Sequence, residues 1–564
     1  MRILFLTHSF NSLSQRLYIE LTQAGHEVCV EFDISDAVTG EAVALYRPDL
    51  IVAPFLKRAI PADVWRRHVC LVVHPGIKGD RGPSALDWAI LNAEPEWGVT
   101  VLQAGAEMDA GDIWAEARFP MRLAKKSSLY RFEVTEAATR AVMDAVTKFA
   151  RGGYVPEPLD YDNPSVRGRL RPALCRHERT IHWAQDDTAT VLRKIHAADG
   201  FPGVPDTLCG EPVYLFDAHL EPALRGVPGE LIGWCNGALC RATADGAVWI
   251  GHLKQAQDAS FKLPATQVLA GKLGELPEIE NGWQDIRYEE KNQVGYLSFD
   301  FYNGAMGSTQ CERLRLAYLE ARKRDTRVLV LLGGEDFWCN GIHLNLIEAA
   351  DSPADESWRN INAMNDLAHA ILTSDDKLVI AALRGNAGAG GVFLALAADQ
   401  VAARRGVVLN PHYKAMGNLY GSEYWSYSLP RRVGTEYARA ITENRLPLGA
   451  TLAGKIGLID ACFGDSPEAF RREVETLAQT LATAPDYALK LAAKQALRAR
   501  DEAEKPLCAY RAEELAHMAL NFYGFDSSYH VARYHFVHKL PHSRTPRHLA
   551  LHRRIAAPTG GGKG

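Results

Sequence analysis

The chain has 564 residues, a formal net charge of −5 and 47% hydrophobic residues. This length exceeds what one hydrophobic core usually serves, so we expect several domains. The weakly acidic charge offers no footprint for a polyanion, which argues against a nucleic-acid partner. The apolar run Ile3–Leu6 is too short for a signal peptide, and no run reaches the roughly 18 residues that span a bilayer. We therefore predict a cytoplasmic protein without a membrane partner.

Residues 1–160 alternate apolar runs with helical patterns. Residues 13–24 have helical spacing and are followed by Gly25, a residue typical of a helix C-terminus. No GxGxxG motif follows the first apolar run, so a dinucleotide fingerprint is absent. Continuous apolar runs with crossover helices predict a parallel sheet in an α/β domain. The expected strands are Ile3–Leu6, Val28–Val30, Leu50–Ala53 and Cys70–Val73.

Two further domains are expected downstream. A proline-bearing stretch, residues 154–172, is interpreted as a linker. Short runs within residues 165–275 predict a small β-barrel-like domain. Residues 283–545 are again α/β in pattern, so the predicted fold class is a multidomain α/β protein. Expected strands here are Glu230–Trp234 and Ala247–Gly251 in the small domain, then Val294–Phe299, Val328–Leu332 and Leu378–Ala382.

No metal site is predicted. The ten cysteines contain no CxxC pair, which favours reduced, buried thiols. Residues 546–564 are expected to form a tail, disordered at its end. The histidines near the C-terminus stand among arginines without carboxylates at ligand spacing, so we expect a solvated basic face. They are His530, His535, His538, His542, His548 and His552.

His74 follows the fourth apolar run, where open α/β sheets bind ligands. A histidine there can carry a proton near neutral pH, and Asp109 can orient it or stabilise its charged form. On these residues alone, the alternative is a structural histidine and a turn aspartate.

The segment around His74 resembles the 10-formyltetrahydrofolate-dependent formyltransferases, such as methionyl-tRNA formyltransferase. The resemblance implies 10-formyltetrahydrofolate as the formyl donor, with His74 as proton carrier and Asp109 as its orienting carboxylate. It further implies that Arg81, Gly82 and Asp112 belong to the loops around the folate and the formyl group. The motifs that carry it are His74, Arg81-Gly82-Pro83, Gly98-Val99-Thr100 and Asp109-Ala110-Gly111-Asp112, in that order.

One position departs from that family. Its asparagine, which helps to hold the tetrahedral oxyanion, is replaced by Val72, which has no side-chain donor. Such a donor is worth about 3 kcal/mol. We expect a changed formyl acceptor, and a thiol is favoured because it is a stronger nucleophile than water. Slower transfer, or folate binding without efficient catalysis, are the alternatives.

Two glycine-bearing turns, Arg384–Gly391 and Phe337–His343, follow strands in the third segment. Small residues let a helix N-terminus approach a ligand, where free backbone N–H groups can hold an oxyanion. Together the turns resemble the crotonase (enoyl-CoA hydratase/isomerase) superfamily, over roughly residues 285–530. The resemblance implies binding of a coenzyme A thioester, with the N–H groups of Ile342 and Gly390 as its oxyanion hole.

The catalytic glutamates of a hydratase do not carry over, since Phe393 and His412 stand at their positions. Nearby, Tyr413 can donate a hydrogen bond, and Glu423 can act as a base if desolvation raises its pKa. Taken alone, Tyr413 could be an amphipathic surface residue and Glu423 a solvated helix charge.

The order formyltransferase, small β domain and crotonase resembles the HypX (HoxX) family of nickel–iron hydrogenase maturation factors. The stretch Pro411–Gly417 and the run Gly421–Glu423 are characteristic of it. The resemblance implies transfer of the formyl group to coenzyme A and decarbonylation of formyl-CoA to carbon monoxide, assisted by Tyr413 and Glu423. It suggests hydrogenase maturation proteins as partners. Alternatives are formyl-CoA hydrolysis, formyl transfer to an amine, and a non-catalytic cofactor-binding scaffold.

Overall fold

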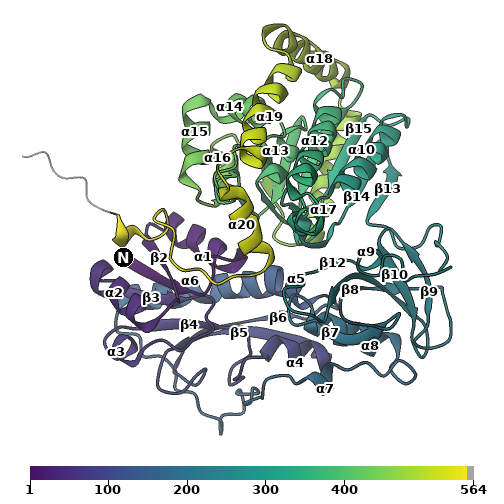
Figure 1. Cartoon of the computed structure of the whole chain (residues 1–564). Helices are drawn as coiled ribbons and strands as arrows, with labels where there is room; N and C mark the ends of the chain where they lie inside the picture. The colour runs from purple at the N-terminus through teal and green to yellow at the C-terminus, as the bar shows by residue number, and fades with distance from the viewer. Residues whose placement is uncertain (555–564) are drawn as a thin grey trace, which may run out of the picture. The chain divides into compact units, whose positions relative to one another are not determined.

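The fold is that of a computed structural model, which describes residues 1–554 (Figure 1). Contacts divide the chain into two compact units. One comprises residues 1–181, 189–204 and the segment from Pro541 onward, and the other comprises residues 182–188 and 205–540. None of the helices in residues 1–554 combines the length and apolar character that a membrane crossing requires.

The first unit contains a six-stranded sheet of order β2-β1-β3-β4-β5-β6. The first four strands are parallel, as the continuous apolar runs predict, and β5 and β6 extend the sheet with antiparallel pairing. The residues between β5 and β6 are too few for a crossover, so these two strands form a hairpin. The strands are β1 (Arg2–Thr7), β2 (Glu27–Phe32), β3 (Leu50–Ala53), β4 (Cys70–His74), β5 (Glu96–Gln103) and β6 (Ile113–Pro120).

Helices connect and cover this sheet. The first begins after Asn11, whose side chain accepts a hydrogen bond from the Ser14 N–H, and ends before Gly25, whose φ is +87°. This confirms the predicted helix and its glycine stop. The helical elements are α1 (Ser12–Gln23), α2 (Asp36–Tyr46), α3 (Ala62–Trp65), α4 (Ala85–Leu91), α5 (Lys126–Leu129), the π-helical turn η1 (Tyr130–Val134), α6 (Thr135–Arg151), α7 (Arg176–Arg179), α8 (Thr188–Ala198) and the 3₁₀ turn η3 (Leu551–Arg553).

Part of the expected C-terminal tail is folded onto this unit. The Leu549 carbonyl accepts a hydrogen bond from the Val30 N–H of β2, and Leu549 and Ala550 are buried. The prediction of a tail is therefore wrong for residues 546–554, because their apolar side chains pack against the sheet. Residues 555–564 lie outside the described part of the chain.

The expectation of a solvated basic face is also wrong for His552. Its side chain is fully buried, with Nδ1 3.0 Å from the Cys29 sulfur and Nε2 2.8 Å from a Glu31 oxygen. Arg553 and the Thr545 hydroxyl also donate to Glu31. The basic residues here neutralise a buried carboxylate of β2.

The small β domain is an open sheet of order β7-β8-β11-β10-β9, with β12 paired to β11. A barrel requires its two edge strands to pair, and β7 and β9 do not, so the barrel-like expectation is corrected. The elements are β7 (Val204–Leu208), β8 (Glu211–Glu221), β9 (Leu231–Cys235), β10 (Ala238–Ala242), β11 (Ala247–Gln255), β12 (Leu263–Pro264) and α9 (Ala265–Val268).

The remainder of the second unit contains two sheets, of orders β13-β14-β15-β17-β19-β22 and β16-β18-β20-β21. Apart from the antiparallel pairs β13–β14 and β20–β21, neighbouring strands run parallel. The strands are β13 (Ile286–Lys291), β14 (Val294–Phe299), β15 (Val328–Leu332), β16 (Phe337–Cys339), β17 (Leu378–Leu383), β18 (Asn386–Gly388), β19 (Gln400–Arg404), β20 (Val408–Asn410), β21 (Leu448–Gly449) and β22 (Ala461–Phe463).

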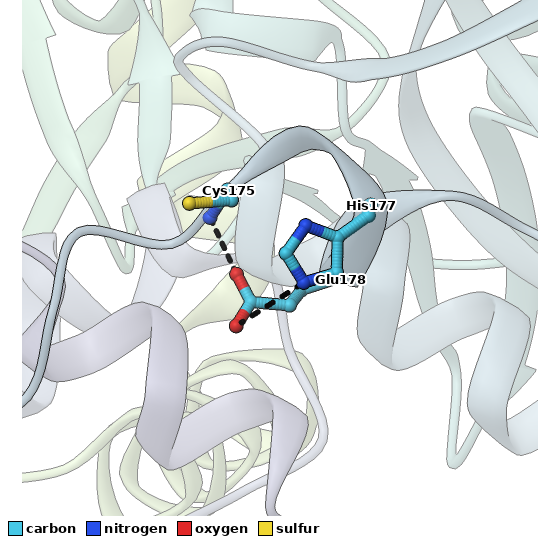
Figure 2. Close-up of side chains that lie close together, drawn as sticks. All are labelled: Cys175, His177 and Glu178. Atoms are coloured by element: carbon cyan, nitrogen blue, oxygen red, sulfur yellow. Dashed lines mark hydrogen bonds and ion pairs between the residues drawn. The ribbon is translucent and has the colours of Figure 1, made fainter.

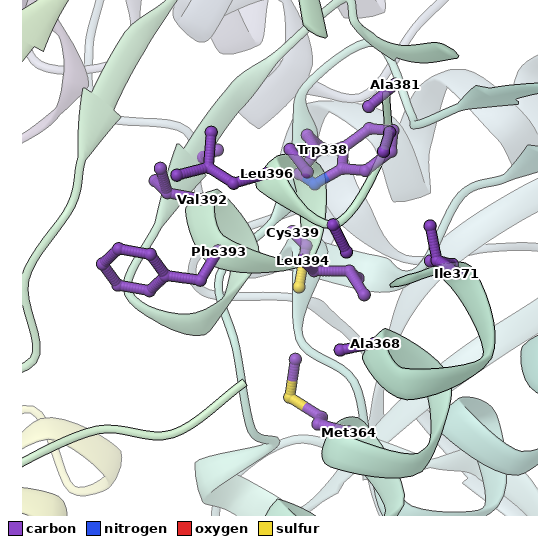
Figure 3. Close-up of a cluster of buried hydrophobic side chains, with 14 of the residues drawn as sticks. Trp338, Cys339, Met364, Ala368, Ile371, Ala381, Val392, Phe393, Leu394 and Leu396 are labelled. Atoms are coloured by element: carbon purple, nitrogen blue, oxygen red, sulfur yellow. The ribbon is translucent and has the colours of Figure 1, made fainter. Parts of the chain in front are cut away.

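The larger sheet is buried on both faces. In β15, Leu329 and Leu331 join one apolar cluster, whereas Val328, Val330 and Leu332 join another. Figure 3 shows part of the first cluster, with side chains of β16, α12, β17 and α13 packed together. The helical elements are η2 (Tyr302–Gly304), α10 (Ser308–Arg322), α11 (Leu344–Ala349), α12 (Pro353–Leu372), α13 (Gly390–Leu396), α14 (Trp425–Val433), α15 (Thr435–Asn444), α16 (Ala450–Lys455), α17 (Pro467–Thr483), α18 (Tyr487–Glu504), α19 (Leu507–Tyr523) and α20 (Ser528–Val537).

Candidate active sites

His74 is the last residue of β4, at the carboxyl end of the parallel strands. Its side chain is 5% exposed and lies between two carboxylates. Nδ1 is 3.6 Å from an Asp109 oxygen, and Nε2 is 3.1 Å from Asp80 Oδ1. The two carboxylates fix the plane of the ring, and each can accept from a ring nitrogen that carries a proton.

Close backbone packing makes this arrangement possible. A side chain at Gly76 would place its Cβ against His74 Nε2, closer than two such atoms can approach. Asp109 has a φ of +55°, a conformation that aspartate tolerates, and its Oδ2 accepts a hydrogen bond from the Gly82 N–H at 3.3 Å. The predicted residues His74, Asp109 and Gly82 are therefore neighbours.

The stretch interpreted as a linker forms one side of this site. Its Arg171 is largely buried, with Nε 3.6 Å from Asp80 Oδ2. The Arg171 backbone N–H donates to the Arg81 carbonyl, and the Gly168 N–H donates to the Lys78 carbonyl. Residues 154–172 therefore pack against the loop that follows His74.

Two predicted loop residues point elsewhere. Arg81 donates to Glu107 at 2.5 Å and to the Met108 carbonyl at 3.3 Å. Asp112 is exposed, and its carbonyl accepts a hydrogen bond from the Gln103 N–H. Neither side chain forms a hydrogen bond or an ion pair with His74, whose partners are Asp80 and Asp109.

Val72 lies two residues before His74 on the same strand, so both side chains point to the same face of the sheet. It is half-buried and packs against the apolar cluster that includes Ile51 and Ala53. The position that was compared with the formyltransferase asparagine therefore has an apolar environment. The Thr100 hydroxyl, on the neighbouring β5, donates to the Gly76 carbonyl.

The second candidate site lies where α13 begins. The ideal Cβ position of Gly341 is 3.5 Å from the Gly390 nitrogen, which places the two glycine-bearing turns side by side. In residues 1–554, neither the Ile342 nor the Gly390 N–H donates a hydrogen bond to another protein group. Two neighbouring, uncommitted N–H groups have the arrangement that an oxyanion hole requires.

Glu423 stands beside these N–H groups. A Cβ at Gly390 would clash with Glu423 Oε1, so only glycine leaves room for the carboxylate. Its Oε2 accepts hydrogen bonds from the Tyr413 hydroxyl at 2.5 Å and from the Ser422 N–H at 3.2 Å. Tyr413 is 8% exposed and Glu423 is 1% exposed. The alternatives of a surface tyrosine and a solvated helix charge are therefore excluded.

Burial raises the pKa of Glu423 to about 8, although the Tyr413 hydrogen bond lowers it. Burial also raises the pKa of Tyr413, and the neighbouring Glu423 charge adds to that shift. The Tyr413 hydroxyl therefore stays protonated and can donate, while Glu423 can take up a proton near neutral pH. Glu423 and Tyr424 both have left-handed backbones, with φ of 58° and 59°, a strain that is common at functional sites.

The two residues expected at the positions of a hydratase's glutamates are both buried. Phe393 is fully buried and stacks on Tyr413, with ring centroids 5.2 Å apart. His412 is also buried. A pocket of about 520 Å³, lined mainly by α14, α15 and α19, reaches this region at Tyr413.

One group of potential metal ligands lies apart from both sites. Cys175, the residue before the four-residue helix α7, lies close to His177 and Glu178 of that helix, as Figure 2 shows. Glu178 is already committed to the Cys175 backbone N–H, and the other two residues are exposed. The cluster is local in sequence and has no further ligand among the described residues.

Sequence reasoning missed several residues of these sites. Asp80 lies inside the loop that was compared with formyltransferases, six residues after His74. A carboxylate so near a candidate catalytic histidine could have been named from the sequence as its partner. Arg171 was assigned to a linker. Asn365 and Glu514 reach the loop that carries Glu423 only through the tertiary fold, so no local signal could have found them.

Both residues accept hydrogen bonds from the backbone of that loop. The Glu423 N–H donates to Asn365, 58 residues away in the chain, at 2.8 Å. The Tyr424 N–H donates to Glu514, 90 residues away, at 3.0 Å. The position of Glu423 therefore depends on two helices that are distant in sequence.

Comparison with known protein families gives three matches along the chain. Residues 2–146 match the family model "Formyl transferase", residues 174–272 match "Formyl transferase, C-terminal domain", and residues 301–541 match "Enoyl-CoA hydratase/isomerase". The formyltransferase and crotonase resemblances read from the motifs are thereby confirmed.

Individual proteins resemble the chain over its full length or over part of it. A hydrogenase maturation factor HoxX from Bradyrhizobium diazoefficiens is 57% identical over 560 residues, which cover 99% of this chain and 98% of that protein. A methionyl-tRNA formyltransferase from Burkholderia pseudomallei is 26% identical over 40% of this chain and 68% of its own length. The crystal structure of HypX from Aquifex aeolicus in complex with tetrahydrofolic acid is 49% identical, with a TM-score of 0.95, and covers 98% of this chain and 99% of that one.

Proposed function

Since the chain belongs to the HoxX/HypX family of hydrogenase maturation factors, we propose that it makes carbon monoxide from 10-formyltetrahydrofolate, with coenzyme A as the formyl carrier. The carbon monoxide would serve as the iron ligand of nickel–iron hydrogenase. The observation that carries this proposal is the buried Tyr413–Glu423 pair beside the uncommitted N–H groups of Ile342 and Gly390.

The first reaction is proposed at His74. A coenzyme A thiol attacks the formyl carbon of 10-formyltetrahydrofolate, and the carbon–nitrogen bond to the folate then breaks. The thiol proton leaves and the folate nitrogen gains one, so a group that holds and releases protons is required. His74 between Asp80 and Asp109 suits this role. The known relative that binds tetrahydrofolic acid supports folate as the ligand.

The second reaction is proposed at Glu423. Glu423 takes the proton from the formyl carbon of formyl-CoA, the carbon–sulfur bond breaks, and its electron pair leaves with the sulfur. The thiolate then takes the proton back from Glu423, so the products are carbon monoxide and coenzyme A, with no net oxidation or reduction. The N–H groups of Ile342 and Gly390 would hold the thioester oxygen, and Tyr413 would donate a hydrogen bond near the reacting atoms.

The chain's residues also argue against a hydratase. Water addition to a double bond would need the two glutamates that Phe393 and His412 replace. Phe393 is buried against Tyr413, so it excludes water from that side of the pair.

The test is to supply Glu423→Gln with 10-formyltetrahydrofolate and coenzyme A and to follow tetrahydrofolate and formyl-CoA by mass spectrometry. Formyl-CoA should accumulate, because the first reaction proceeds and the second is blocked. Exposed Glu513→Gln serves as the matched control and should not accumulate it. Tetrahydrofolate release by Glu423→Gln without any formyl-CoA would contradict the proposed carrier.

A further inference from the structure

The loop that carries Glu423 is held by a buried carboxylate from α19. Glu514 is fully buried, and its Oε2 accepts hydrogen bonds from the Tyr424 N–H at 3.0 Å and the Ser422 hydroxyl at 3.3 Å. Its Oε1 accepts from the Ser426 N–H at 2.9 Å and the Ser426 hydroxyl at 2.6 Å. One side chain therefore binds residues on both sides of Glu423.

A second helix holds the same loop. The Oδ1 atom of Asn365, on α12, accepts a hydrogen bond from the Glu423 N–H at 2.8 Å and lies 3.0 Å from the Ser422 hydroxyl, whose single proton it shares with Glu514. The loop backbone is thus bonded to side chains rather than to a neighbouring strand. The consecutive left-handed residues Glu423 and Tyr424 need such support, because this conformation persists only where its surroundings fix it.

We propose that Glu514 is a positioning residue of the second site, which fixes the loop so that the Glu423 carboxylate stands between Gly390 and Tyr413. This inference rests on the proposed function, because it assigns to Glu514 a role in formyl-CoA decarbonylation. Glu514 acts through the loop, since its hydrogen bonds go to Ser422, Tyr424 and Ser426.

The charge of Glu514 adds a second effect. Burial raises the pKa of Glu423, the Tyr413 hydrogen bond opposes this, and the Glu514 charge raises it again. Burial likewise raises the pKa of Glu514. The thiols of Cys311, on α10, and Cys339, on β16, also lie within electrostatic range of Glu423, and burial raises the pKa of both, so they remain neutral.

A neutral residue at 514 therefore changes both the position and the pKa of the base. In Glu514→Gln the amide nitrogen faces N–H or O–H donors, so bonds on one side of the loop are lost. We expect kcat for carbon monoxide release from formyl-CoA to fall by about tenfold or more, with KM within about twofold. The acid limb of the rate profile should move to lower pH, because the negative charge that raises the pKa of Glu423 is gone.

The experiment measures carbon monoxide release from synthetic formyl-CoA against pH for wild type, Glu514→Gln and Glu513→Gln. Glu513 is the exposed neighbour on the same helix, bonded to Lys505, and its variant should match wild type. Tetrahydrofolate release from 10-formyltetrahydrofolate is measured in parallel and should stay unchanged in both variants. A purely structural role for Glu514 would lower the amount of active protein without moving the acid limb.

Ser426→Ala gives a second test in case Glu514→Gln does not fold. It removes one hydrogen bond and keeps the charge, so kcat should fall by about two- to fivefold while the acid limb stays in place. The inference is overturned if Ser426→Ala, and Glu514→Gln where it folds, match wild type in kcat and in pH profile. If wild type itself releases no carbon monoxide, the proposed function has failed instead.

Discussion

His74 has two carboxylate partners, and the one at Nε2, Asp80, is not among the residues that the formyltransferase motif singles out. Asp80 is fully buried and is also close to Arg171. Loss of its charge weakens the hydrogen bond that fixes the orientation of the ring, because a neutral oxygen accepts less strongly than a carboxylate. A change at Asp80 therefore tests how His74 is held, separately from His74 itself.

We predict that Asp80→Asn slows tetrahydrofolate release from 10-formyltetrahydrofolate by about tenfold or more, because His74 loses a charged partner. Steady-state kinetics of this reaction provide the measurement. Asp144→Asn, at an exposed position on α6, is the control and should behave as wild type. Equal rates for Asp80→Asn and Asp144→Asn would show that Asp80 has only a structural role.

Tyr413→Phe should act on the pH profile in the opposite direction to Glu514→Gln. The Tyr413 hydrogen bond lowers the pKa of Glu423, so its removal lets that pKa rise further. Because the base works in its deprotonated form, the acid limb of carbon monoxide release should move to higher pH. Rate profiles with formyl-CoA test this, and a shift to lower pH would argue against Glu423 as the base.

How much of each site could be predicted depends on where its contacts lie along the chain. The two glycine-bearing turns after apolar runs leave a local sequence pattern, and the crotonase resemblance assigned Ile342 and Gly390 within them. The contact between His74 and Asp80 spans six residues, but its chemistry depends on the path of the loop. The bonds from Glu514 to the loop at Ser426 span 88 residues and leave no local pattern.

At the scale of elements, the C-terminal segment folds as part of the first unit. His552, Thr545 and Arg553 surround the buried Glu31 of β2. The sequence could not reveal this, because a basic histidine-containing segment has the same composition whether it is solvated or bonded to a buried carboxylate. The apolar strands could be predicted, because their pattern does show in the sequence. A continuous apolar run such as Val328–Leu332 is typical of a strand that is covered on both faces of its sheet.

We predict that His552→Ala destabilises the first unit by about 1.5–3 kcal/mol at neutral pH, the usual range for a hydrogen bond to a charged group. Burial lowers the pKa of His552, but bonds to Cys29 and Glu31 outweigh it and raise the pKa to about 9. A raised folded-state pKa gives stability that is fully present below about pH 6.5 and is lost as pH rises through about 9.

Calorimetric unfolding of wild type and His552→Ala between pH 6 and pH 10 measures this contribution, with the pH range set by the ordinary and raised histidine pKa values. The difference between the two proteins should shrink above about pH 9. A difference that is constant over this range would mean that the histidine contributes packing rather than charge.

At the scale of the whole molecule, one chain contains a formyltransferase unit and a crotonase-type module, each with a candidate site of its own. In the proposed function neither reaction alone gives carbon monoxide from the folate donor, because the first makes formyl-CoA and the second consumes it. The proposed function therefore requires both sites in the same reaction sequence. Loss of either should abolish carbon monoxide, whereas only loss of the second should leave tetrahydrofolate release intact.

The most direct measurement supplies the purified protein with formyl-labelled 10-formyltetrahydrofolate and coenzyme A, and traps carbon monoxide on reduced haemoglobin. We predict labelled carbon monoxide from wild type, none from His74→Ala or Glu423→Gln, and none from wild type without coenzyme A. Labelled formate in place of carbon monoxide would contradict the account, because the second site would then hydrolyse formyl-CoA or only bind it.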